Sequence, residues 1–194
     1  MQWIPFLLYV LVTSFTPGPN NIMSMAYASK SGYRNTLRFI LGVAVGTTVI
    51  ALLSSFFNLL LFNFIPKVKL WMSIFGGLYM VYLAMKMLMH KPRANEDQHE
   101  KLNSFTSGLI LQFINPKVIL YAITAISTFI IPFYHSTVSL ILFSCFLGFI
   151  GYASTSSWAV FGAIFQSFLR KYERAFHLVM GLLLLYSAII IFLG

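Results

Sequence analysis

The sequence is short of acidic residues and of charge in general. Only 4 of its 194 residues are Asp or Glu, and charged residues make up 9% of the chain. Soluble domains carry about 25% charged residues, so this composition excludes an ordinary soluble domain. The net charge of +9 could suggest nucleic acid, but the basic residues lie in short stretches between apolar runs. That placement is typical of membrane proteins, and we expect no nucleic-acid partner.

Catalytic and cofactor-binding patterns are absent as well. Cys145 is the only cysteine, so neither an intrachain disulfide nor a two-cysteine redox relay can form. The histidines, at 90, 99, 135 and 177, are scattered and show no metal-ligand spacing. No glycine-rich phosphate loop ending in Lys-Ser or Lys-Thr occurs, which argues against a nucleotide-driven pump. We therefore expect no enzyme, no metal and no other cofactor.

The chain is rich instead in long apolar runs. Hydrophobic residues make up 59% of it, and its mean hydropathy is +0.83. A helix needs about 20 residues to cross a hydrocarbon core of about 30 Å, and six segments are long enough. The sequence predicts an all-α membrane protein with six transmembrane helices, near 3–27, 39–62, 68–89, 105–131, 137–164 and 175–193.

Basic residues predict the orientation of these helices. The first, third and fifth loops carry most of the Lys and Arg residues, whereas the second carries two and the fourth none. By the positive-inside rule, the odd-numbered loops are cytoplasmic. We expect a multi-pass protein of the inner or plasma membrane with both termini outside.

The chain also divides into two similar halves. Residues 90–104 contain the only sizeable hydrophilic stretch and predict a cytoplasmic linker between a three-helix repeat at 1–89 and a second one at 105–194. Pro17 in the first span has a counterpart in Pro116 in the fourth. An odd number of spans per half inverts the second half, and inverted repeats with interrupted helices indicate a secondary transporter. Chance similarity between apolar segments is the alternative.

Two of the predicted helices are broken near their middles. The stretch Thr16-Pro17-Gly18-Pro19-Asn20-Asn21 interrupts the first span, and Asn115-Pro116-Lys117 interrupts the fourth. Proline removes a backbone donor and clashes with the preceding turn, and in hydrocarbon the freed groups need partners in the protein or in a water-lined cavity. We expect both second half-helices, beginning near Asn20 and near Lys117, to present free N–H groups and a positive dipole end.

Lys117 places a positive charge near the middle of the predicted fourth span. A cation at the bilayer centre costs about 2.5–3.5 kcal/mol on insertion scales, so we expect Lys117 to face an internal cavity and attract a carboxylate. The alternative is that it pairs with backbone carbonyls freed by a broken helix. Asn20, Asn21 and Asn115 can each donate and accept, which suits an amino acid, although capping of the helices would explain them equally well.

Hydroxyl groups extend the candidate site. Tyr121 follows Lys117 by one helical turn, and Tyr152 begins a polar cluster in the fifth span. Hydroxyls in membrane helices more often bond to neighbouring helices or to their own backbone than to a substrate. Gly42 and Gly46 form a pair of small residues that we expect to pack within the bundle, with a homodimer contact as the alternative. The predicted substrate-binding residues are Pro17, Gly18, Asn20, Asn21, Asn115, Lys117, Tyr121 and Tyr152.

These motifs resemble a known family. Residues 15–21, with Gly32-Tyr33-Arg34 after them, resemble the N-terminal signature of the lysine exporter (LysE/RhtB) superfamily, and Asn115-Pro116-Lys117 resembles its second-half signature. The runs 111–115 and 125–132 look most like the cysteine and O-acetylserine exporter branch.

The resemblance implies export of a small neutral amino acid from the cytoplasm, driven by the proton gradient. Many members carry an aspartate in the fifth span, where this chain has Gly151-Tyr152-Ala153, so the proton pathway is left open. The alternatives are export of homoserine, threonine or other amino acids, and a small channel.

Overall fold

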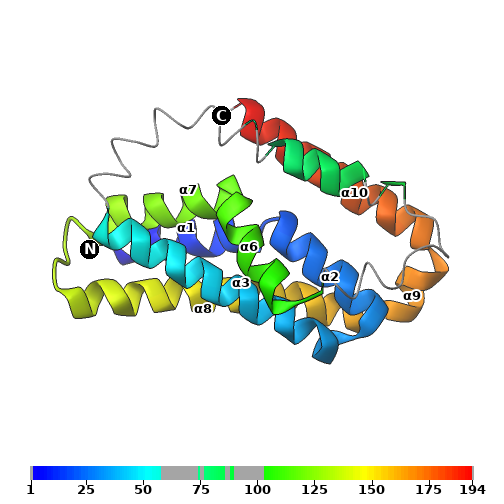
Figure 1. Cartoon of the computed structure of the whole chain (residues 1–194), viewed down its shortest axis with the longest axis horizontal. Coiled ribbons are helices and arrows are strands. Elements are labelled where there is room, and N and C mark those ends of the chain that lie inside the picture. The colour runs from blue at the N-terminus through cyan, green and yellow to red at the C-terminus, as the bar shows by residue number, and fades with distance from the viewer. Residues whose placement is uncertain (1, 58–73, 75–76, 86–87, 90–102, 194) are drawn as a thin grey trace.

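The computed structural model describes residues 2–57, 74, 77–85, 88–89 and 103–193 (Figure 1). This part of the chain forms helices and no strands, which confirms the predicted all-α class for the described residues. Part of the predicted third span at 68–89 and most of the linker at 90–104 lie outside them.

The helices follow one another in chain order, and residues 77–85 are helical in addition. Their bounds are α1 (Trp3–Phe15), α2 (Pro19–Ser31), α3 (Tyr33–Phe56), α6 (Phe105–Ile114), α7 (Pro116–Thr124), the π-helix η1 (Ala125–Ile130), α8 (Thr137–Ile164), α9 (Gln166–Lys171) and α10 (Glu173–Leu193).

Two of the described helices are long and apolar enough to cross a membrane. They are α3, with 24 residues, and α8, with 28. A third span results if α6 and the helical stretch Pro116–Ile130, which meet at an angle of 69°, cross together. The bent pair and α8 match the spans predicted at 105–131 and 137–164, whereas α3 overlaps the span predicted at 39–62 but begins six residues earlier, at Tyr33. Shorter apolar helices lie at Trp3–Phe15 and Arg174–Ile189.

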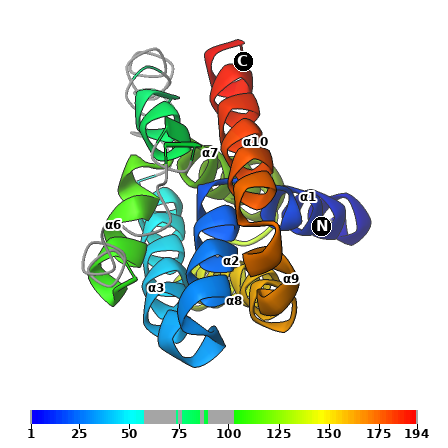
Figure 2. The same ribbon diagram turned by 90° about the vertical axis from the view of Figure 1, so that its right-hand side faces the viewer.

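The two helices that flank the first break have opposite environments. Residues 21–29 of α2 are all buried, and α2 lies between α3, α8 and α10 (Figure 2). Its polar groups therefore meet protein partners, as where the Ser24 hydroxyl donates to the Thr155 carbonyl at 3.0 Å. By contrast, α1 leaves an apolar stripe exposed, formed by Ile4, Leu7, Leu8, Leu11, Val12 and Phe15.

Each interrupted pair of helices packs against the long helix of the other half. Helices α1 and α2 contact α8, helices α6 and α7 contact α3, and α3 contacts α8. Helices α3 and α6 approach each other closely, since a Cβ added at Gly42 would collide with the Phe105 carbonyl and one at Gly108 with the Phe39 carbonyl. The small residues thus serve packing within the bundle, as expected for Gly42.

The core consists of two main apolar clusters. One joins α2, α3, residues 77–85 and α10 around Ile22, Phe39 and Leu184. The other joins α1, α7, η1 and α8 around Phe6 and Ile126. Side chains from these helices also line the cavity described below.

Candidate functional site

The first break begins where α1 ends. Thr16 is extended, with φ −65° and ψ 151°, and so is Gly18, with φ −175° and ψ 174°. Proline disfavours the helical region for the residue before it, and Pro19 is well suited to the first position of α2 because its missing N–H would be unpaired there in any case. No side chain caps α2.

The carbonyl groups freed at the end of α1 are bound by side chains from elsewhere. Asn21 donates from Nδ2 to the carbonyls of Ser14 and Thr16, at 2.8 and 3.0 Å. The Ser154 hydroxyl lies 2.7 Å from the Ser14 carbonyl and 3.0 Å from the Asn21 Oδ1, and is a donor to both. Asn21 therefore caps the end of α1, not the start of α2 to which it belongs.

Lys117 reaches across to the same break. Its ammonium donates to the Thr16 carbonyl at 3.0 Å, the Thr16 hydroxyl at 3.1 Å and the Pro17 carbonyl at 3.3 Å. A cation at the carbonyl end of a helix is also favoured by the helix dipole. The alternative considered for Lys117 from the sequence, pairing with freed carbonyls, is thus observed, and the carbonyls are those of the opposite break.

The second break caps itself. Asn115 is extended, and its Oδ1 accepts from the backbone N–H of Lys117 at 3.1 Å. Its carbonyl accepts from the N–H of Val118, also at 3.1 Å, and Pro116 has no N–H to offer. The prediction of free N–H groups at the start of α7 is therefore wrong, because the asparagine before the proline satisfies them.

Of the two breaks, only the first leaves backbone amides free in the part of the chain that the structure describes. Pro19 has no N–H, and the amide of Ile22 donates to the Gly18 carbonyl at 2.9 Å. Within the described chain, the backbone amides of Asn20 and Asn21 have no acceptor. The start of α2 thus offers two donors and a positive dipole end to an anion.

The side-chain amides of Asn20 and Gln112 form two hydrogen bonds with each other and so link the two breaks. Asn20 Nδ2 donates to Gln112 Oε1 at 2.7 Å, and Gln112 Nε2 donates back to Asn20 Oδ1 at 3.1 Å. Gln112 is fully buried and also donates to the Gly108 carbonyl at 2.7 Å. Gly46 makes room for it, since a Cβ there would lie 2.6 Å from the Gln112 Cγ.

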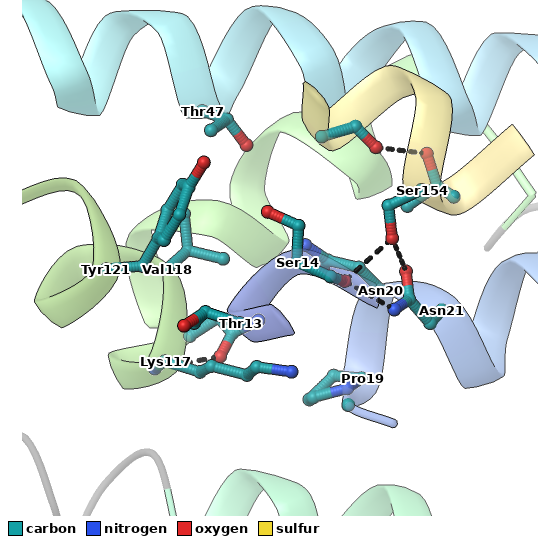
Figure 3. Close-up of a pocket in the computed structure, with 14 residues that line it drawn as sticks. Thr13, Ser14, Pro19, Asn20, Asn21, Thr47, Lys117, Val118, Tyr121 and Ser154 are labelled. Carbon is teal, nitrogen blue, oxygen red and sulfur yellow. Dashed lines mark hydrogen bonds between the residues drawn. The ribbon is translucent and has the colours of Figure 1, made fainter. Parts of the chain in front are cut away.

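A cavity of about 40 Å³ lies where these groups meet (Figure 3). A cavity needs at least about 10–15 Å³ to hold a water, so this one has room for water. Lys117 is the one charged side chain among its lining residues. These are Thr13, Ser14, Gly18, Pro19, Asn20, Asn21, Thr47, Asn115, Lys117, Val118, Tyr121, Gly151, Ser154 and Thr155.

Most of the predicted site residues line this cavity. They are Gly18, Asn20, Asn21, Asn115, Lys117 and Tyr121. Pro17 is not in the lining, but its carbonyl binds Lys117.

Tyr152 lies apart from the cavity. It packs against a cluster of Ala28, Ile40 and Ala159. The physical reason is helical geometry: residues 151, 154 and 155 of α8 share the face that lines the cavity, and residue 152 is turned away from it.

Other lining or supporting residues were not predicted as site residues. Thr13 and Ser14 stand in the last turn of α1 before the first break, and Gln112 stands three residues before Asn115. A search for polar side chains within one turn of each break would have found them. Thr47 lies in the uninterrupted helix α3, and no local signal marks it.

Comparison with known proteins now identifies the family. The LysE type translocator family matches residues 11–194. This chain belongs to the LysE translocator family. It is 35% identical over 187 residues to the cysteine/O-acetylserine efflux protein of Escherichia coli strain K12, which covers 96% of this chain and 95% of the relative.

Proteins of the same name in Shigella flexneri serotype 5b and Shigella sonnei show the same identity and coverage. No solved structure matches the chain. As a LysE translocator with apolar spanning helices, the protein is a membrane transporter and not an enzyme.

Proposed function

We propose that this LysE translocator is a secondary transporter that exports small neutral amino acids, such as cysteine or O-acetylserine, from the cytoplasm in exchange for protons. Family membership supports translocation. The names of relatives at 35% identity support the substrate class. The cavity at the two breaks supports the same substrate by its chemistry.

The observation that carries this proposal is one cation beside two free amides in an otherwise uncharged cavity. The carboxylate of an amino acid fits between the Lys117 ammonium and the amides of Asn20 and Asn21. When Lys117 turns to the carboxylate, it leaves the carbonyls of Thr16 and Pro17, which can then accept from the amino group of the substrate. No acidic side chain lines the cavity, so a cationic side chain would find no partner, which favours neutral amino acids.

Substrate entry requires the cavity to widen. An amino acid is several times larger than a water, and the cavity measures only about 40 Å³. The Lys117 side chain occupies adjacent space, because a Cβ added at Gly18 would lie 3.0 Å from its Nζ and 3.2 Å from its Cδ. Movement of Lys117 away from the first break would both free this space and loosen one link between the breaks.

Few titratable side chains are placed to carry the proton in such an exchange. All acidic residues of the chain lie at 96, 97, 100 and 173, and none of the described residues that line the cavity is acidic. Lys117 and Tyr121 are the only side chains in the lining that can titrate. Coupling through the cavity would therefore use Lys117, with the ammonium as the protonated form.

The proposed architecture is six transmembrane helices in two inverted three-helix repeats, 1–89 and 105–194, joined by a cytoplasmic linker. The reciprocal packing of α1 and α2 on α8, and of α6 and α7 on α3, supports it. Both termini then lie outside the inner or plasma membrane. A reporter enzyme fused after Asn95 should be active only as a cytoplasmic reporter; activity of a periplasmic or extracellular reporter at that site would refute the orientation.

Counterflow in proteoliposomes tests the function. Vesicles that contain the purified protein and a high internal concentration of O-acetylserine or cysteine should accumulate the labelled amino acid from outside, and empty vesicles should not. Accumulation identifies a carrier. Equilibration without accumulation would favour the small channel instead, and no flux of any amino acid would refute the proposed transport.

A further inference from the structure

The cavity has a second polar side, away from the groups that are proposed to bind the carboxylate and the amino group of a substrate. Tyr121 of α7, Thr47 of α3 and Ser14 of α1 line it together. In Figure 3 their hydroxyl groups point toward a common space, apart from the Lys117 ammonium. This group of three is called the hydroxyl cluster below.

The Tyr121 hydroxyl lacks a partner. The side chain is 5% exposed, and its oxygen is buried with no hydrogen bond in the described chain. It lies beside the Ser14 hydroxyl, but the two do not reach hydrogen-bond geometry. The ring is also held in place by stacking on Tyr9, at 6.1 Å between centroids and 18° between planes. Buried polar groups in native proteins are nearly always paired, so this hydroxyl calls for a ligand or a water.

Thr47 differs from the other hydroxyl residues of α3. The hydroxyls of Thr48, Ser54 and Ser55 each donate to the carbonyl four residues earlier, at 2.8–2.9 Å. Within the described chain, Thr47 makes no such bond and lines the cavity instead. Its hydroxyl is therefore available to a molecule in the cavity.

We propose that the hydroxyl cluster is a side-chain subsite that selects neutral amino acids whose side chains accept a hydrogen bond, such as the ester group of O-acetylserine. This inference rests on the proposed function and assigns the part of the cavity that distinguishes one neutral amino acid from another. An aliphatic side chain of similar length would displace water and leave the Tyr121 hydroxyl unpaired, which is unfavourable. Selectivity then comes from the cluster, and general affinity for amino acids comes from Lys117.

Competition experiments with a matched pair of ligands test this subsite. O-acetylserine and norleucine are compared as inhibitors of counterflow in proteoliposomes, and as ligands that raise the Tm of the purified protein. We expect the wild type to prefer O-acetylserine by about tenfold or more. Tyr121→Phe and Thr47→Val should each reduce that preference by about three- to tenfold, the value of a hydrogen bond, and bind norleucine as well as the wild type does.

Two neighbouring substitutions are the controls. Tyr9→Phe and Thr48→Val remove hydroxyls next to the cluster that do not line the cavity, and should leave the preference unchanged. An unchanged preference in both Tyr121→Phe and Thr47→Val, or equal affinity of the wild type for both ligands, would overturn the subsite. Flux without discrimination would thus refute the subsite alone, whereas discrimination in Tm without any flux would refute the proposed export and support the subsite.

Discussion

The two helix breaks differ in how their freed backbone groups find hydrogen-bond partners. The second break is satisfied locally, since Asn115 caps the helix that follows it with its own side chain and carbonyl. The first break has no such cap, and its carbonyls are bound by Asn21, Ser154 and Lys117. One break is therefore a stable support, and the other depends on partners that a substrate could displace.

The largest expected effect comes from removing the cation that links the breaks. Lys117→Gln should lower counterflow by about 30-fold or more, because losing one partner of a buried charge pair costs about 2–5 kcal/mol. Glutamine can still donate to the carbonyls of the first break, so the variant should insert and fold. Lys171→Gln on α9, outside the cavity, serves as the control and should transport normally. Counterflow by Lys117→Gln at the wild-type rate would contradict the role of the cation.

A smaller effect distinguishes the caps of the two breaks. Asn21→Ala removes the two hydrogen bonds to the carbonyls of Ser14 and Thr16 and the one accepted from Ser154, and each of these bonds contributes about 0.5–1.5 kcal/mol. Asn115→Ala removes one helix cap, at about 1 kcal/mol. Thermal unfolding in detergent should therefore show a greater loss of Tm for Asn21→Ala. Equal losses, or a greater loss for Asn115→Ala, would show that the first break is not the more dependent one.

The smallest effect concerns the glycine at the first break. Gly18→Ala needs Lys117 to shift by only a few tenths of an ångström, because the contact is with the end of a flexible side chain. Counterflow should fall by less than about threefold, the equivalent of about 0.6 kcal/mol. At Gly42 the same change meets the Phe105 backbone carbonyl, and Gly42→Ala should lower the Tm clearly. A greater loss of Tm in Gly18→Ala would show that the glycine is needed for the backbone itself.

The positions of the breaks could be predicted from the sequence because proline acts on its immediate neighbours. Pro19 and Pro116 each begin a helix and keep the preceding residue extended, as local chemistry requires. Lys117 and the asparagines could be assigned to the site for the same reason, since they stand next to the prolines.

The partners of these residues could not be predicted in the same way. Lys117 binds carbonyls about a hundred positions away, at Thr16 and Pro17, and only the packed bundle brings them together. Helix α8 is apolar over most of its length, so its pattern did not show that residues 151, 154 and 155 face the cavity while Tyr152 faces elsewhere. Packing against α3 determines that rotation, as where a Cβ at Gly148 would collide with Thr48.

The central claim is that Lys117 binds the carboxylate of the substrate, and one binding measurement tests it directly. The affinities of O-acetylserine and of its carboxamide, which lacks the negative charge, are measured for the wild type and for Lys117→Gln. We predict that the wild type binds the acid about 100-fold more tightly, or about 2.7 kcal/mol, and that Lys117→Gln keeps only the small preference that the N-terminus of α2 supplies. A variant that keeps the wild-type preference for the acid would show that the carboxylate is bound elsewhere.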